Sequence, residues 1–116
     1  MTRDMDTIRQ ILLAIEKEEL SELELDESKL KYHTHLLVDA GFIEATDVTT
    51  RDDARQNLRA YVVHGLTWAG HEFIDAARDD GIWAKAKKSV SKIGSVSMPI
   101  WINLLTMYAK RQLGLN

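Results

Sequence analysis

The sequence contains no cysteine, a single proline and no long uninterrupted hydrophobic run. The lack of cysteine excludes disulfide bonds, thiolate metal sites and catalysis by a cysteine nucleophile. The most apolar stretch, residues 98–109 (MPIWINLLTMYA), is well short of the ~20 residues that a membrane-spanning helix needs. The opening segment MTRDMDTIRQ is charged and lacks the apolar centre of a signal peptide. We therefore expect a cytoplasmic protein with no membrane partner.

The motifs of common active sites are also missing. The chain has no phosphate-cradling glycine loop, no Gly-x-Ser-x-Gly elbow and no carboxylate pair in a recognisable motif, so we expect no enzymatic activity, no cofactor and no small-molecule substrate. His33 and His35 are two residues apart and would point to nearly opposite sides of a helix, whereas helical metal ligands are four apart. The sequence therefore predicts no metal site, and His33 is expected to be a partly buried residue bonded to the backbone.

Acidic residues are absent from residue 81 onward. All 18 Asp and Glu residues lie in positions 1–80 with nine Lys and Arg, a net charge of −9, whereas residues 81–116 carry six Lys and Arg and no acid. Three explanations fit this division: a basic tail that packs on the acidic body of its own or a neighbouring subunit, a cationic surface for a polyanion, or two solvated faces of unlike sign. It suggests a domain over residues 1–80 and a basic C-terminal extension over residues 81–116.

The clearest local signal is a helix that ends on a glycine and continues into a strand at residues 26–43 (DESKLKYHTHLLVDAGFI). Asp26 is expected to cap the first turn, Leu30 and Leu37 face a core, and Gly41 takes the left-handed conformation that ends a helix. Before this stretch, residues 3–19 predict an amphipathic helix. Residues 20–25 (LSELEL) predict a short strand or an extended link.

Beyond the glycine, residues 42–48 and 58–66 predict the two strands of a hairpin, because both are rich in β-branched and aromatic residues. The polar segment between them, residues 49–57 (TTRDDARQN), is predicted to be an exposed loop.

Three further helices are predicted after the hairpin. Thr67 should cap the first, which is expected to end at Gly81 and to place Trp68 among its apolar contacts. Residues 82–93 predict a lysine-rich helix whose apolar side includes Ile93.

The last predicted helix begins at residue 97 or 98 and is apolar on more than one side. Because a monomer of this size would struggle to cover it, we expect a homo-oligomer, most simply a dimer, formed through this helix. One face is predicted to be the interface, and it consists of Ile100, Trp101, Leu104, Leu105 and Tyr108.

The segments YHTHLLVDAGFIEA and GLTWAGHEF resemble the helix-to-wing segment and the following helix start of winged helix-turn-helix repressors. More closely, the chain resembles an uncharacterised bacterial and prophage-encoded family of short proteins. The resemblance implies an α+β, mostly helical fold: a winged helix-turn-helix domain with a two-stranded hairpin wing and two added C-terminal helices. A second helix, usual in that fold, has room for only a few residues here.

This fold would place duplex DNA against the exposed side of the helix at residues 26–40 and the wing. The expected contacts are Ser28, Lys29, Lys31, Tyr32, His35, Arg51, Arg55 and Arg59. Cations among them would neutralise phosphates, and hydroxyl or imidazole groups would donate hydrogen bonds. The acidic residues flanking this surface oppose that function. The alternatives are that the lysines form only a solvated helix side, or that the chain is a protein-interaction or oligomerisation module.

Overall fold

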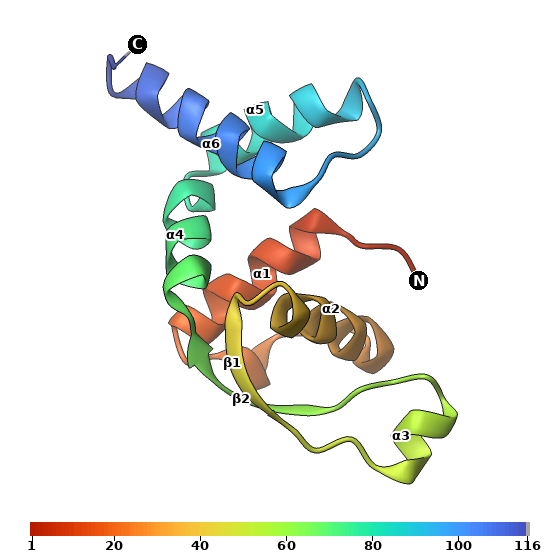
Figure 1. The fold of residues 1–116 in the computed structure, drawn as a ribbon. Coiled ribbons are helices and arrows are strands. Elements are labelled where there is room, and N and C mark those ends of the chain that lie inside the picture. Colours follow the sequence, from red (N-terminus) through yellow and green to blue (C-terminus); the bar gives the residue numbers. More distant parts are fainter. Residues whose placement is uncertain (116) are drawn as a thin grey trace. The chain divides into compact units, whose positions relative to one another are not determined.

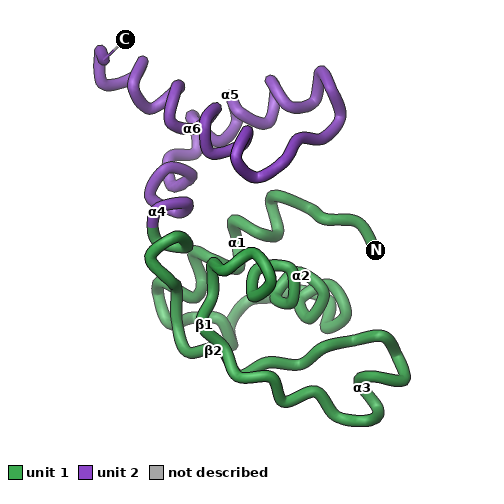
Figure 2. The backbone as a smooth tube through the Cα atoms, in the orientation of Figure 1, with its two compact units in different colours: residues 1–71 green, residues 72–116 purple. Residues whose placement is uncertain are grey.

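The computed structural model describes residues 1–115 and shows an α+β, mostly helical protein (Figure 1). Six α-helices and a two-stranded antiparallel sheet occur within these residues, one helix more than the sequence predicts, and the α+β, mostly helical class is as predicted. The chain divides into two compact units, Met1–His71 and Glu72–Asn116 (Figure 2). The sequence-based boundary at 80/81 therefore falls inside the second unit. No helix in the described part of the chain has the length and apolarity needed to cross a bilayer.

Helix α1, Met5–Glu16, packs on helix α2, Glu27–Asp39, in the first unit. Both predicted ends of α2 are confirmed. The Asp26 carboxylate accepts a hydrogen bond from Lys29 N at 3.2 Å, and Gly41 follows the helix with a φ of +80°. Helix α1 is shorter than the predicted range 3–19, because Asp4 already caps it and Glu18 leaves the helical region with a φ of 58°.

Of the two alternatives predicted for residues 20–25, the strand does not form, and the extended link is limited to the residues after Glu22. A single 3₁₀ turn, η1, spans Leu20–Glu22, and its carbonyl at Leu20 accepts a hydrogen bond from Leu23 N at 3.2 Å. The apolar residues of this segment alternate, but no neighbouring strand is available for pairing. The turn instead provides hydrogen bonds for backbone N–H and C=O groups, which need partners wherever they are shielded from water.

Strands β1, Ile43–Asp47, and β2, Tyr61–Leu66, form the predicted hairpin. Ile43 pairs with Leu66 and Asp47 with Tyr61, and an irregularity between Glu44 and Ala45 shifts the register.

The segment between the strands is not the unstructured loop that was predicted. It contains a short helix, α3, Arg51–Arg55, at the far end of the hairpin (Figure 1). Thr50 Oγ1 accepts from Asp53 N at 3.1 Å, and the Asp53 carboxylate accepts from Thr50 N at 3.0 Å. This reciprocal capping box makes one helical turn out of a polar sequence.

Helix α4, Trp68–Ala77, begins with a close approach between backbone segments. Thr67 caps it as predicted, with Oγ1 accepting from Gly70 N at 3.1 Å. A Cβ at Gly70 would lie 2.2 Å from the carbonyl oxygen of Phe42, so only glycine fits here. Trp68 was expected to make apolar contacts but is 81% exposed, because it lies on the opposite side of the helix from the buried Phe73.

The second unit contains α5, Asp80–Ser91, and α6, Met98–Gln112. Gly81 does not end α4 as predicted but lies in the first turn of α5, which Asp79 caps by accepting from Ile82 N at 2.9 Å. The two helices pack through the stacked rings of Trp83 and Trp101, whose centroids are 4.9 Å apart. Ile93, expected in the core, follows the helix end and is 78% exposed.

Candidate functional site

The outward side of α2 carries the lysines that the sequence singles out, and both form ion pairs. Lys29 Nζ lies 3.3 Å from the Asp4 carboxylate, at the start of α1. Lys31 Nζ lies 2.9 Å from Asp53 in α3 and 3.1 Å from Glu27, one turn earlier on α2. Lys31 therefore joins α2 to the tip of the hairpin, and its side chain is only 23% exposed.

The ion pair between Lys31 and Asp53 shifts the pKa values of both groups. The hydrogen bond from Lys31, with two more from Thr50, lowers the pKa of Asp53 to about 2. The contacts with Asp53 and Glu27 raise the pKa of Lys31 in turn. Both groups are thus charged at neutral pH, and a phosphate that approached Lys31 would compete with a carboxylate already in place.

His35 and Tyr32, on the same helix, are half-buried. The Nδ1 atom of His35 lies 2.7 Å from the Tyr61 hydroxyl in β2, and its Nε2 atom lies 3.3 Å from the Asp39 carboxylate. The His35 and Tyr61 rings also stack, with centroids 5.9 Å apart. His35 therefore ties α2 to the sheet, while Tyr32 and Ser28 remain partly exposed beside the lysines.

The three arginines of the hairpin segment differ in their surroundings. Arg59 pairs with Asp47, and Arg55 Nη1 lies 3.5 Å from Asp52. Hydrogen bonds from Thr49, followed by the one from Arg59, hold the pKa of the Asp47 carboxyl far below its usual range. Arg51 is exposed and makes no ion pair within residues 1–115. Of the five predicted phosphate-binding cations, Arg51 is thus the one whose charge is not already shared with an acid.

His33 is not part of this surface. It is completely buried, with Nδ1 2.8 Å from the Lys29 carbonyl and Nε2 2.9 Å from Asp4 N. The geometry requires Nδ1 to donate and Nε2 to accept, which corresponds to a neutral ring. The backbone bond was predicted; the depth of burial and the link to α1 were not.

Sequence reasoning missed the acids that hold the cations. Asp4 and Asp53 stand 25 and 22 residues from the lysines that they contact. No spacing rule connects residues so far apart, whereas the partner of Lys31 at Glu27 follows the ordinary i, i+4 pattern of a helix.

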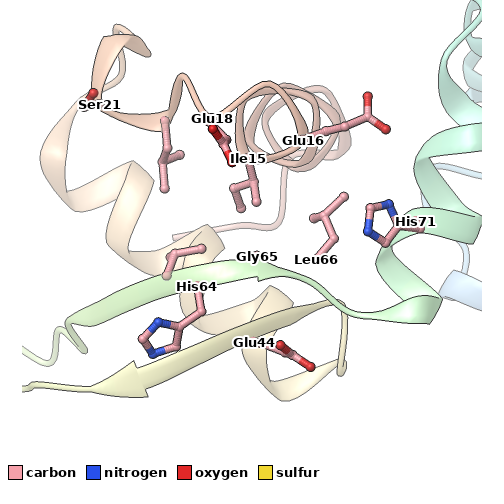
Figure 3. Close-up of a pocket in the computed structure, with 11 residues that line it drawn as sticks. Ile15, Glu16, Glu18, Ser21, Glu44, His64, Gly65, Leu66 and His71 are labelled. Atoms are coloured by element: carbon pink, nitrogen blue, oxygen red, sulfur yellow. The ribbon is translucent and has the colours of Figure 1, made fainter.

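A cavity of about 490 Å³ opens elsewhere on the first unit, between the end of α1, β2 and the start of α4 (Figure 3). Its lining combines the apolar side chains of Ile15 and Leu66 with Glu16, His64 and His71. The His64 ring is already engaged, since Nε2 lies 2.7 Å from Thr46 Oγ1 on the neighbouring strand. Within residues 1–115 no group of three or more histidine and acidic side chains is placed to hold a metal ion.

The predicted interface on α6 is divided between core and surface. Trp101 is 3% exposed and Leu105 is completely buried, so these two side chains pack within the chain and are not available to a partner. Trp101 stacks on Trp83 in α5, a contact that periodicity alone does not reveal. Ile100 is 47% exposed, and Leu104 and Tyr108 are half-buried, with the Tyr108 hydroxyl 2.6 Å from Ser89 Oγ.

Comparison with known proteins gives a family and a relative. A family described as "Hypothetical protein (DUF2513)" matches residues 2–97. An uncharacterized protein of Haemophilus influenzae is 34% identical over 98 residues, which cover 78% of this chain and 79% of that protein. No solved structure matches the chain.

Proposed function

The chain belongs to the DUF2513 family, and we propose that it is a winged-helix protein that binds duplex DNA as a cytoplasmic transcriptional regulator of the prophage or mobile-element type. The family description names no activity, so the proposal rests on the first unit. Its element order, α1, η1, α2 and the β1–β2 hairpin, supports the proposal, because a winged helix whose second helix was reduced to one turn would have the same order.

The contact between α2 and the hairpin tip is the observation that carries the proposal. Because Lys31 reaches Asp53, the polar side of α2 and the α3 turn lie side by side, and Arg51 extends from the same turn. In winged-helix complexes the helix enters the major groove while the wing reaches the backbone or the minor groove. Ser28, Lys29 and Tyr32 would then approach the groove, and Arg51 would approach phosphates.

The acids on this surface set the expected strength of binding. Phosphates would have to displace Asp4 from Lys29 and Asp53 from Lys31, so the loss of these ion pairs would offset part of the attraction between the lysines and DNA. Binding should therefore be weak and steeply dependent on salt, since each neutralised phosphate contributes a slope of about −0.9 in log affinity against log salt.

Fluorescence anisotropy with a labelled duplex of about two turns tests the proposal. Lys29→Ala, Lys31→Ala and Arg51→Ala should each weaken binding several-fold at low salt. Asp53→Asn should instead strengthen it several-fold, because it removes a negative charge and releases Lys31. Asp75→Asn is the matched control, since it removes a negative charge and the 2.8 Å ion pair with Arg78 in the second unit. Unchanged affinity in all three cation variants would remove the proposal.

A second candidate function, protein interaction through the same fold without DNA, is favoured by the ion pairing and by the exposed apolar residues. Trp68 and Val62 are 81% and 50% exposed on the first unit, and Ile100 is exposed on α6. This function predicts a homodimer that persists at high salt and is lost in Ile100→Lys, together with no retention on DNA at low salt. Sedimentation velocity over a range of salt concentrations separates the two candidates.

A further inference from the structure

The most concentrated positive charge in the described chain lies on α5 of the second unit, not on α2. Lys85, Lys88 and Lys92 follow one another at spacings of three and four residues, so they share one side of the helix. All three are exposed. The buried side chains of the same helix lie on the other side: Ile82, Trp83, Ala86 and Val90.

These lysines differ from Lys29 and Lys31 in forming no ion pair, although Lys85 interacts electrostatically with Asp79, the residue that caps the helix. No ion pair involves Lys85, Lys88 or Lys92 within residues 1–115, and the sequence has no Asp or Glu after Asp80. The helix is also held in place on its inner side, through the Trp83–Trp101 stack and the contact between Ser89 and Tyr108. The lysine side is therefore an exposed row of positive charges without ion pairs, carried on a helix that is packed on its inner side.

We propose that Lys85, Lys88 and Lys92 form a second DNA contact, which binds the phosphate backbone of the duplex without reading its sequence. The inference rests on the proposed function, because it takes the same duplex as partner. The three ammonium groups span two turns of helix, about 10 Å, which is the scale of two to three successive phosphates along one strand. Non-specific backbone contacts of this type position a protein on DNA while other residues contact the bases.

An anionic membrane is the other polyanion that a lysine row could meet, and the packing of α5 argues against it. A helix that lies in a membrane surface buries its apolar side among the lipids. In α5 that side is occupied, because Trp83 stacks on Trp101 and because Ile82, Ala86 and Val90 are buried. DNA needs only the exposed lysine side.

The test is a salt titration of duplex binding by the full chain, measured by anisotropy. The triple variant Lys85→Gln, Lys88→Gln, Lys92→Gln should bind at least tenfold more weakly at low salt. Its slope of log affinity against log salt should be shallower by about 2.7, at about 0.9 for each lost contact. The double variant Lys88→Gln, Lys92→Gln has a matched control in the double variant Lys17→Gln, Lys110→Gln. The control removes the same charge at exposed positions outside the row. Its affinity for the duplex should stay within about twofold of wild type.

The outcomes separate this inference from the proposed function. One outcome is that the triple variant keeps the wild-type slope of log affinity against log salt, while Lys29→Ala and Arg51→Ala bind DNA more weakly than wild type. This outcome would overturn the α5 contact and leave the proposed α2 site in place. The reverse pattern would support the α5 contact and overturn the α2 site. A wild-type chain that does not bind the duplex would overturn both, and lysine-dependent binding to phosphatidylserine vesicles in its place would assign the row to a membrane.

Discussion

At the residue scale, the first unit is joined by polar side chains that each contact two elements. His33 is the most buried of them: it lies in α2, receives a hydrogen bond from Asp4 N ahead of α1, and contacts the Lys29 carbonyl through its other nitrogen. Because Asp4 also caps α1 and pairs with Lys29, the start of one helix is held to the side of the other by both charged and neutral bonds.

His33→Ala should lower the free energy of unfolding by about 2–4 kcal/mol, because it leaves a cavity and removes the acceptor of Asp4 N. Urea denaturation followed by circular dichroism measures the change. His35→Ala serves as the comparison, since His35 has the same ring on the same helix but is partly exposed. Its cost should be about 1 kcal/mol or less, and equal losses in the two variants would show that burial of His33 does not decide the effect.

How far residue roles can be predicted depends on the distance along the chain over which they act. Asp26, Gly41 and Thr67 are correctly predicted, because a helix cap satisfies backbone groups two to four residues away. The pairing of Lys31 with Asp53 could not be predicted, because it depends on how the hairpin folds back toward α2. The sequence therefore pointed to Lys29 and Lys31 as exposed cations but did not reveal that Asp4 and Asp53 pair with them.

At the element scale, α3 shows how a polar segment becomes helical. Its five residues are too few to be stable alone, since helix nucleation is costly. The capping box of Thr50 and Asp53 and the ion pair with Lys31 offset that cost. The pattern differs from the usual box in having aspartate at the last position, and the segment lacks apolar periodicity, so the sequence favoured a loop.

Thr50→Ala should loosen α3 without unfolding the protein. Losing the cap costs about 1 kcal/mol, so hydrogen exchange at Asp53 N should accelerate about fivefold. Amide exchange measured by NMR tests this locally. Thr106→Ala, at an exposed position of α6, should leave exchange in α3 unchanged. Unaltered protection of Asp53 in the Thr50 variant would mean that the Lys31 contact alone holds the turn.

At the scale of the whole molecule, carboxylates whose pKa is lowered by folding are distributed over both units. Hydrogen bonds lower the pKa values of Asp47 and Asp53 in the hairpin, and a backbone hydrogen bond from Ile82 lowers that of Asp79 at the start of α5. A carboxyl whose pKa is lower in the folded chain stabilises the fold above its unfolded pKa, near 3.8, and loses that contribution as the pH falls toward its folded pKa. Stability should therefore decline between pH about 4 and about 2.

Asp53→Asn isolates one part of this decline. Wild type should be more stable than the variant above pH about 4, and the difference should shrink as the pH approaches 2, where Asp53 becomes protonated in the folded chain. Thermal unfolding at several pH values measures it. A difference between the two proteins that stays constant down to pH about 2 would show that Asp53 does not gain stability from its ionised form.

The junction at Gly70 restricts how this chain can diverge. Alanine there would collide with the Phe42 carbonyl, an atom fixed by its bond from Thr67 N at 3.1 Å. A homologue with a larger residue at this place must have separated the helix start from the strand start. Any alignment that sets a bulky residue opposite Gly70 while keeping the strand pairing intact is therefore misregistered, which gives evolutionary comparisons a fixed reference column.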